Sequence, residues 1–152
     1  LVQGSPERFI SAFSDAMIAA QNMVVAAESL GMGTVYLGSI LNDNAKLSEL
    51  LKLPKYVYPA VGLAVGWPDQ EPQLKPRLPR HVIHMENYYQ DLENSLEELK
   101  DYDAEVHEYY DLRDLNNRVD EFTTQIAKTM DKSVANRANT LKDLQKQGFF
   151  MD

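Results

Sequence analysis

The sequence predicts a chain that combines α-helices with a few short β-strands. Residues 6–30 repeat apolar side chains at helical spacing, whereas residues 34–37 and 57–65 are short runs of β-prone residues. Residues 91–121 are strongly acidic and again carry apolar side chains at helical intervals. At 152 residues, the chain has the length of one domain with a substantial core.

The first expected element is a long helix. Ser5 supplies a capping hydroxyl, Pro6 stands in the first turn, and Glu7 adds an early carboxylate. Apolar and small residues then cover most of the circumference as far as Leu30, which is typical of a buried helix. Gly31 is the expected left-handed cap at its end.

The expected strands lie on either side of a second helix. Residues 34–37 predict a buried strand between two glycines. Asn42 or Asp43 is expected to cap the helix, which ends before Pro54. Residues 57–65 predict a second strand with an irregular entry.

The second half is expected to be helical. After a proline-rich connector, residues 81–84 predict a short extended piece. Residues 91–121 hold twelve Asp or Glu against three Lys or Arg, which predicts one long acidic amphipathic helix, broken over residues 112–117. Two shorter helices are expected after it, near 121–132 and 136–147, with Gly148 as the final cap.

Composition limits the function. The formal net charge of -8 argues against broad nucleic-acid binding, which needs a basic surface. The absence of cysteine excludes disulfides, thiolate nucleophiles and cysteine zinc sites, and it suits a reducing cytosol. No uninterrupted apolar run is long enough for a bilayer, so no membrane partner is expected.

The connector carries the most informative cations. Lys75 and Arg77 stand on either side of Pro76, so an extended backbone could aim both the same way. A planar guanidinium and a mobile ammonium together suit a phosphate group. The alternative is a stiff surface connector with solvated charges.

Other polar groups are less specific. His81 and His84, with Glu86 nearby, could supply metal ligands, but the sequence offers no compelling third ligand. They are interpreted as ordinary polar residues beside a strand. Arg113 and Arg118 flank a polar break, where they could grip a ligand phosphate or simply neutralise nearby acids and cap the next helix. No pattern indicates a catalytic nucleophile, acid or base.

Three blocks together carry a resemblance to a known family. They run from Asp15 to Gly38, from Leu51 to Pro54, and from Gly62 to Pro79, where Gly-Trp-Pro is followed by Lys-Pro-Arg-Leu-Pro. The chain resembles the flavin reductase and oxygen-insensitive nitroreductase family, in its larger NADPH-preferring branch. The resemblance extends over essentially the whole chain, which corresponds to the C-terminal part of a family member.

The resemblance implies an α+β fold, with a nitroreductase-like mixed sheet flanked by helices. The family's N-terminal part, including a His-Arg-Ser-type segment that contacts the flavin, is expected to be missing, and a helical extension is expected at the C-terminal side. Residues 1–152 would then form one partial nitroreductase-like domain. Within it, residues 1–85 would hold the core helix, the strands and the FMN-phosphate loop, and residues 86–152 the helical extension.

The resemblance also implies site residues. The flavin would lie beside a backbone segment, its phosphate would be held by two cations, and the NADPH 2′-phosphate would be recognised by two arginines. An arginine that the family places near the substrate is expected to be replaced around residues 135–136, with Arg137 displaced from that position. The implied FMN residues are Tyr36, Leu37, Gly38, Ser39, Lys75 and Arg77, and the implied NADPH residues are Arg113 and Arg118.

The implied protein is an FMN-dependent NAD(P)H oxidoreductase of the cytoplasm. NADPH or NADH would deliver hydride through FMN to a nitroaromatic, a quinone or free flavin in a ping-pong reaction, with no catalytic side chain. A homodimer is implied, and Phe13, Met17 and Met23 of the apolar first helix suit a subunit interface. The alternative is a non-enzymatic acidic helical interaction module or an inactive fragment.

Overall fold

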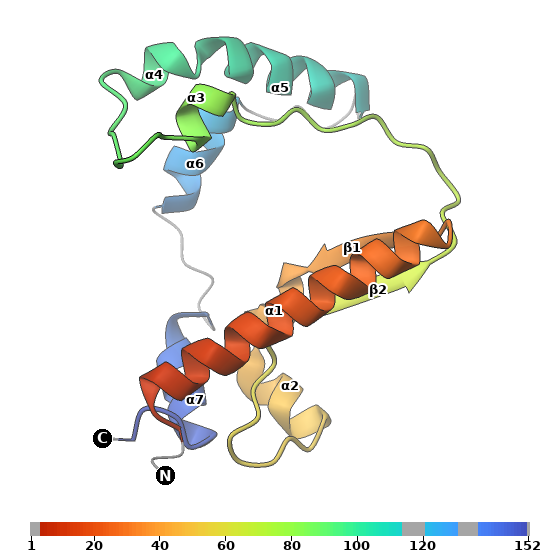
Figure 1. The fold of residues 1–152 in the computed structure, drawn as a ribbon, viewed down its shortest axis with the longest axis vertical. Coiled ribbons are helices and arrows are strands. Elements are labelled where there is room, and N and C mark those ends of the chain that lie inside the picture. The colour runs from red at the N-terminus through yellow and green to blue at the C-terminus, as the bar shows by residue number, and fades with distance from the viewer. Residues whose placement is uncertain (1–3, 114–120, 131–136, 152) are drawn as a thin grey trace. The chain divides into compact units, whose positions relative to one another are not determined.

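The structure is a computed structural model that describes residues 4–113, 121–130 and 137–151, without the side chains of residues 111–113. The chain divides into two compact units. Unit 1 comprises Leu1–Glu71 and Ser133–Asp152, and unit 2 comprises Pro72–Lys132. Figure 1 shows the described helices and strands. Helices and a small sheet coexist, as the sequence predicts.

Helix α1 (Pro6–Ser29) opens unit 1 and has the predicted caps. The Ser5 hydroxyl accepts from the Arg8 backbone N–H at 3.4 Å. At the other end, Gly31 has a φ of 76°. Its N–H donates to the Glu28 carbonyl, and the Met32 N–H donates to the Ala27 carbonyl, which is the Schellman arrangement.

The sheet has two antiparallel strands in the described residues, β1 (Gly33–Leu37) and β2 (Gly62–Gly66). They pair from Gly33 opposite Gly66 to Leu37 opposite Gly62. The second strand therefore begins five residues later than the predicted 57–65. The prediction that the first strand is buried was wrong, because Val35 remains 55% exposed.

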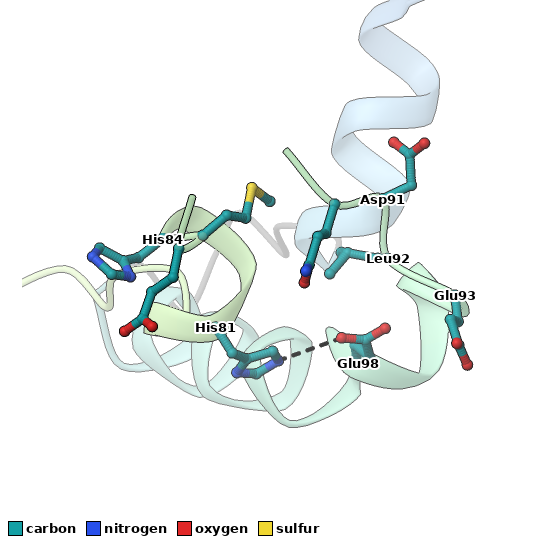
Figure 2. Close-up of a pocket in the computed structure, with 9 residues that line it drawn as sticks. His81, His84, Asp91, Leu92, Glu93 and Glu98 are labelled. Atoms are coloured by element: carbon teal, nitrogen blue, oxygen red, sulfur yellow. Dashed lines mark ion pairs between the residues drawn. The ribbon is translucent and has the colours of Figure 1, made fainter. Parts of the chain in front are cut away.

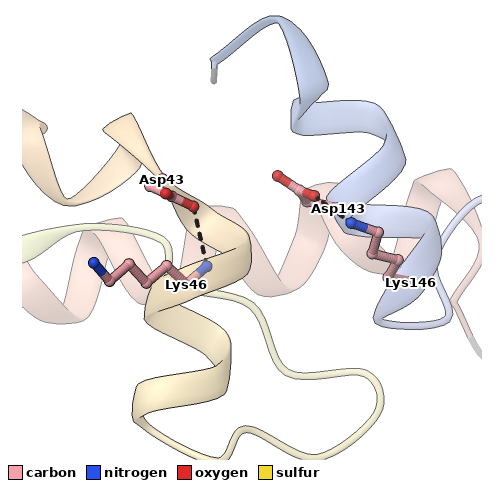
Figure 3. Close-up of polar contacts among 4 residues, drawn as sticks. All are labelled: Asp43, Lys46, Asp143 and Lys146. Carbon is pink, nitrogen blue, oxygen red and sulfur yellow. Dashed lines mark hydrogen bonds and ion pairs between the residues drawn. The ribbon is translucent and has the colours of Figure 1, made fainter. Parts of the chain in front are cut away.

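Two short helices lie between β1 and β2 in the chain. The 3₁₀ helix η1 (Gly38–Asn42) begins directly after β1, and α2 (Asn44–Leu50) follows it. Asp43 caps α2, as predicted, by accepting from the Lys46 N–H at 3.0 Å. Helix α7 (Thr140–Lys146) contacts α2. Figure 3 shows Asp43 and Lys46 at the start of α2 together with Asp143 and Lys146 of α7. Asp143 and Lys146 form an ion pair with a distance of 3.3 Å.

An aromatic cluster joins the start of α1 to the last described residues. The Phe9 ring lies 5.2 Å from the Phe149 ring and 5.4 Å from the Phe150 ring, measured between centroids. The Phe150 N–H also donates to the Gly4 carbonyl at 2.9 Å. Gly148 ends α7 with a φ of 93°, which confirms the predicted cap.

Helix α1 is buried on a narrow face only, whereas the sequence predicted burial over most of its circumference. Ala20, Val24 and Ala27 are buried, but Ile10 is 63% exposed and Leu30 is 68% exposed. By length and composition α1 is the single candidate membrane span in the part of the chain that the structure describes. A core helix of a soluble protein meets the same criteria, so this observation alone does not indicate a membrane protein.

Unit 2 begins with residues 72–79, which form no regular element. Helix α3 (Arg80–Ile83) follows, closed by a bond from the His84 N–H to the Arg80 carbonyl at 2.9 Å. The prediction of an extended piece at 81–84 was therefore wrong. Pro79 explains the difference, because its extended backbone stands at the N-cap position and starts a helical turn there.

The predicted long acidic helix is divided into two. Helix α4 (Ser95–Glu98) starts where the Asn94 side chain accepts from the Glu97 N–H at 3.4 Å, and α5 (Lys100–Arg113) follows. The expected start at residue 91 was therefore wrong. The break predicted over residues 112–117 lies mostly outside the described residues.

The core of unit 2 forms where α5 meets its neighbours. Its buried residues are Leu99, Tyr102 and Val106. Helix α6 (Phe122–Met130) packs against α5, and Asp103 accepts from the Thr123 N–H at 2.9 Å and from its hydroxyl at 2.6 Å. In unit 1, the 3₁₀ helix η2 (Arg137–Asn139) precedes α7, so the described residues contain helices at both predicted places, near 121–132 and near 136–147.

Candidate functional site

The first candidate segment, Tyr36–Ser39, lies where β1 passes into η1 in unit 1. The Tyr36 hydroxyl donates to Gln21 Oε1 of α1 at 3.2 Å, which ties this end of the strand to the long helix. Leu37 is opposite Gly62 in the sheet. Residues Tyr36 to Ser39 are all exposed, so this stretch presents backbone and side chains at the surface of the unit.

Gly38 is the most open position of that segment. A Cβ added there would meet no described atom within 4 Å. The absence of a side chain leaves the backbone accessible, which is what close contact with a flat ligand requires. Gly62, by contrast, packs closely against this part of the chain. A Cβ added at Gly62 would lie 2.9 Å from the Ile40 side chain and 3.1 Å from Leu37 Cβ.

Arg137 also contacts this segment, although sequence reasoning gave it no role. Its Nε donates to Asn42 Oδ1 at 2.9 Å, and one of its terminal nitrogens donates to the Gly38 carbonyl oxygen at 3.0 Å. The sequence contained no local signal for this contact, because Arg137 follows Gly38 by 99 residues.

The second candidate group, Lys75 and Arg77, lies on the irregular connector of unit 2, and both side chains are exposed. An Arg77 terminal nitrogen donates to the Lys75 carbonyl oxygen at 3.0 Å. Lys75 Nζ is 5.4 Å from the centroid of the Tyr110 ring, which is a cation–π distance. Among the described residues no carboxylate forms an ion pair with either cation.

Helix α5 holds this connector in place. The Tyr102 hydroxyl donates to the Pro76 carbonyl oxygen at 3.4 Å, a long bond, and Tyr102 itself is buried. Leu78 packs against the core of unit 2. The two cations therefore extend from a backbone that is anchored at the proline between them and at the leucine after them.

A hollow lies beside His81 of α3 and His84, the residue that follows this helix. It has a volume of about 620 Å³ and includes His81, His84, Glu86 and Glu98 in its lining. Figure 2 shows that His81 points toward Glu98, at 3.7 Å from Nε2 to the carboxylate. No group of three potential metal ligands occurs in the described ranges. The histidines lie on a helical turn and beyond it, not beside a strand as predicted.

The two arginines assigned to NADPH are not placed by the structure. Arg113 is the last residue of α5, and its side chain lies outside the description. Arg118 lies wholly outside the described residues. Their role therefore stays a prediction from the sequence.

The family models match both halves of the chain. Residues 2–67 match the nitroreductase family, and residues 75–152 match the C-terminal domain of the nitroreductase family. The first match contains Tyr36, Leu37, Gly38 and Ser39, whereas the second contains Lys75, Arg77 and Arg137. The chain belongs to the nitroreductase family.

Curated relatives agree with this assignment. The chain is 44% identical over 146 residues to an oxygen-insensitive NADPH nitroreductase of Salmonella typhimurium, which covers 96% of this chain and 59% of that protein. It is 40% identical over 148 residues to an NADPH-dependent oxidoreductase of Staphylococcus aureus, and this match covers 95% of this chain and 58% of that protein. The chain thus spans less than two thirds of the length of the curated relatives it matches.

Solved structures confirm the predicted fold class. Nitroreductase A from Vibrio parahaemolyticus has a TM-score of 0.86 and 32% identity, covering 100% of this chain and 60% of that one. The NADPH:FMN oxidoreductase from Vibrio harveyi, solved with NAD⁺, has a TM-score of 0.85 and 32% identity with the same coverage. The chain therefore has the nitroreductase-like α+β fold that the resemblance implied.

Proposed function

We propose that the protein is an FMN-dependent NADPH oxidoreductase. The observation that carries this proposal is the match of both candidate segments to the nitroreductase family, with one segment open at Gly38 and the other presenting two cations that have no described acidic partner. The first segment belongs to unit 1 and the second to unit 2.

The connector suits the phosphate end of FMN. Lys75 and Arg77 are exposed. In the described residues Lys75 contacts the Tyr110 ring and Arg77 donates to a backbone carbonyl, and neither contact is with a carboxylate. A dianionic phosphate offers these cations stronger partners than either neutral group. The anchoring of Pro76 by Tyr102 limits the backbone freedom that would be lost on binding.

The β1–η1 segment suits the ring end. Tyr36 and Leu37 leave 42% and 37% of their surface exposed, which provides apolar area for a flat aromatic group. Gly38 keeps the backbone beside that area free of a side chain. Ser39 follows with an exposed side chain.

FMN, when bound, supplies hydride transfer from NADPH, or from NADH, to an acceptor such as a nitroaromatic, a quinone or free flavin. The protein then needs to bind, orient and exclude water, and no catalytic side chain is assigned. Arg113 and Arg118 are proposed to hold the NADPH 2′-phosphate, because two guanidinium groups suit a dianionic monoester.

We propose a soluble, cytoplasmic homodimer. Support comes from the exposed apolar side chains of α1, which include Ile10, Ile18, Met23 and Val25. An apolar surface of this kind on a soluble protein is normally covered by another protein surface. A second copy is the simplest partner, since a twofold interface uses the same face of both chains.

Titration of the purified protein with FMN tests the proposal. We expect the flavin to bind and to be bleached by NADPH under anaerobic conditions. Lys75→Ala combined with Arg77→Ala should weaken FMN binding by about 100-fold or more, since hydrogen bonds to charged groups contribute roughly 1.5–3 kcal/mol each.

The matched control is Lys100→Ala with Lys128→Ala, which removes the same charge from exposed helix positions of unit 2 outside the candidate connector. This control should retain FMN affinity within about threefold, because exposed charges that do not contact the ligand are screened by salt. Failure of the unsubstituted protein to bind FMN, or equal loss in both double variants, would contradict the proposal.

A further inference from the structure

Arg137 bridges the two ends of η1. One donor of its guanidinium meets the carbonyl oxygen of Gly38, the first residue of that helix, and another meets Asn42 Oδ1 at the last residue. The distances are 3.0 Å and 2.9 Å, both within the normal range of a hydrogen bond. A single planar group therefore fixes both ends of a five-residue turn.

The position of Arg137 is itself held by the chain around it. Its carbonyl oxygen accepts from the Thr140 hydroxyl at 2.7 Å, at the start of α7. Helix α7 contacts α2, the helix that follows η1. Arg137 is thus held by the elements around α7 and α2, and its side chain extends to the first residue of η1.

The first two residues of the turn are not held by packing. Residues Gly38 and Ser39 are exposed, no residue of η1 is buried, and Gly38 has no side chain to pack. A 3₁₀ helix has poorer hydrogen-bond geometry than an α-helix and is short for that reason. A bidentate guanidinium contact is well suited to limit the motion of such a segment.

We propose that Arg137 is a positioning residue for the β1–η1 segment, which it holds in the conformation that receives the flavin. It acts through Gly38 and Asn42 and is not assigned a contact with the flavin. The inference rests on the proposed function in one respect, namely that the ligand of the β1–η1 segment is the flavin. The restraint of the segment by Arg137 is a property of the protein without flavin.

The guanidinium geometry makes the chemistry of this residue specific. A lysine has one ammonium on a flexible stem and lacks the rigid fork that lets two donors reach two acceptors at set positions. Arg137→Lys should therefore restore part of the restraint, whereas Arg137→Ala should restore none. Asn42→Ala removes one acceptor and leaves the contact with Gly38.

The first measurement is hydrogen exchange of the flavin-free protein. We expect the amides of residues 38–42 to exchange about tenfold faster in Arg137→Ala, with Arg137→Lys in between, because local opening becomes easier. The amides of residues 62–66 should be unchanged. In Arg137→Ala, adding Asn42→Ala should have little further effect, because the two side chains share one contact.

The second measurement is FMN affinity together with the visible circular dichroism of the bound flavin. Arg137→Ala should weaken binding by about tenfold and alter the dichroism band, and Arg137→Lys should recover part of both. Lys142→Ala is the control, because it removes an exposed cation of α7, whereas the hydrogen bonds to Gly38 and Asn42 come from Arg137. It should leave both properties unchanged.

The outcomes separate the two ideas. Unchanged exchange of residues 38–42 in Arg137→Ala would overturn the positioning role, whatever the flavin does. Faster exchange in a protein that binds no FMN would contradict the proposed function and leave the restraint standing. Faster exchange with unaltered FMN affinity and dichroism would overturn the link between this restraint and the flavin.

Discussion

Two glycines at opposite ends of β2 respond differently to the same substitution. At Gly62 an added Cβ would approach Ile40 Cγ2 to 2.9 Å, Leu37 Cβ to 3.1 Å and the Leu37 carbonyl oxygen to 3.3 Å. At Gly66 an added Cβ would meet nothing described within 4 Å. Gly62→Ala therefore crowds the candidate flavin segment, whereas Gly66→Ala adds one methyl in open space.

The size of the difference follows from these contacts. Overpacking in a well-filled region costs typically about 1–3 kcal/mol. The Ile40 methyl can move aside, but Leu37 Cβ and its carbonyl belong to the paired strand and can shift only with it. Replacing glycine with alanine also stabilises by about 0.4–1 kcal/mol through the unfolded chain, equally in both variants. The stability difference between them should thus be about 1–3 kcal/mol, with Gly66→Ala the more stable.

Urea unfolding followed by far-ultraviolet circular dichroism measures this difference. Both variants are compared at one protein concentration, because self-association would add to the apparent stability. The slope of free energy against urea should be the same in both, so that the shift in midpoint reports stability. Equal midpoints for Gly62→Ala and Gly66→Ala would refute the proposed crowding of Leu37.

Three further predictions concern both units. Asp103→Ala should lower the free energy of unfolding by about 1–3 kcal/mol, because the Thr123 N–H and hydroxyl lose their acceptor, and Asp103→Asn should cost less, as chemical denaturation would show. Val106→Ala should cost about 1.5–3 kcal/mol in the same assay, since the side chain is only 2% exposed and two methyl groups leave a cavity. Burial, followed by the charge of Asp143, raises the pKa of Tyr58 above 10.0 in the folded state. Stability should therefore fall as the pH rises above 10.0, and denaturation midpoints of Tyr58→Phe should depend less on pH there.

Caps were the most predictable features, because they depend on a few neighbouring residues. Ser5, Asp43, Gly31 and Gly148 all act as predicted. In each case a short side chain or a positive φ satisfies helix-end groups without help from distant parts of the chain. Such local rules could be applied from the sequence alone.

Burial was much harder to predict. The apolar first helix was expected to be covered on most sides, yet Ile18 remains 63% exposed. Apolar periodicity shows that a face avoids water, but not which surface covers it. The prediction for Val35 was wrong for the same reason, since in the described part of the chain the sheet has two strands and the Val35 side chain stays largely exposed.

The candidate site was predicted only in part. Lys75, Arg77 and Gly38 could be named from family motifs, but their present neighbours could not. The Tyr110 ring beneath Lys75 comes from a helix many residues later, and Arg137 reaches Gly38 across 99 residues. Contacts of this kind depend on topology, which no local pattern encodes.

The join between Phe9 and the Phe149–Phe150 pair has a consequence for biosynthesis. Unit 1 takes its residues from two stretches of the chain, with all of unit 2 translated between them. Residues 4–71 therefore leave the ribosome long before the aromatic rings that cover Phe9 exist. During that interval Phe13 and Tyr58 are the aromatic neighbours of Phe9 that residues 4–71 supply, so the start of α1 is less covered than in the complete unit. Unit 2 is one uninterrupted stretch, so all of its residues are translated consecutively.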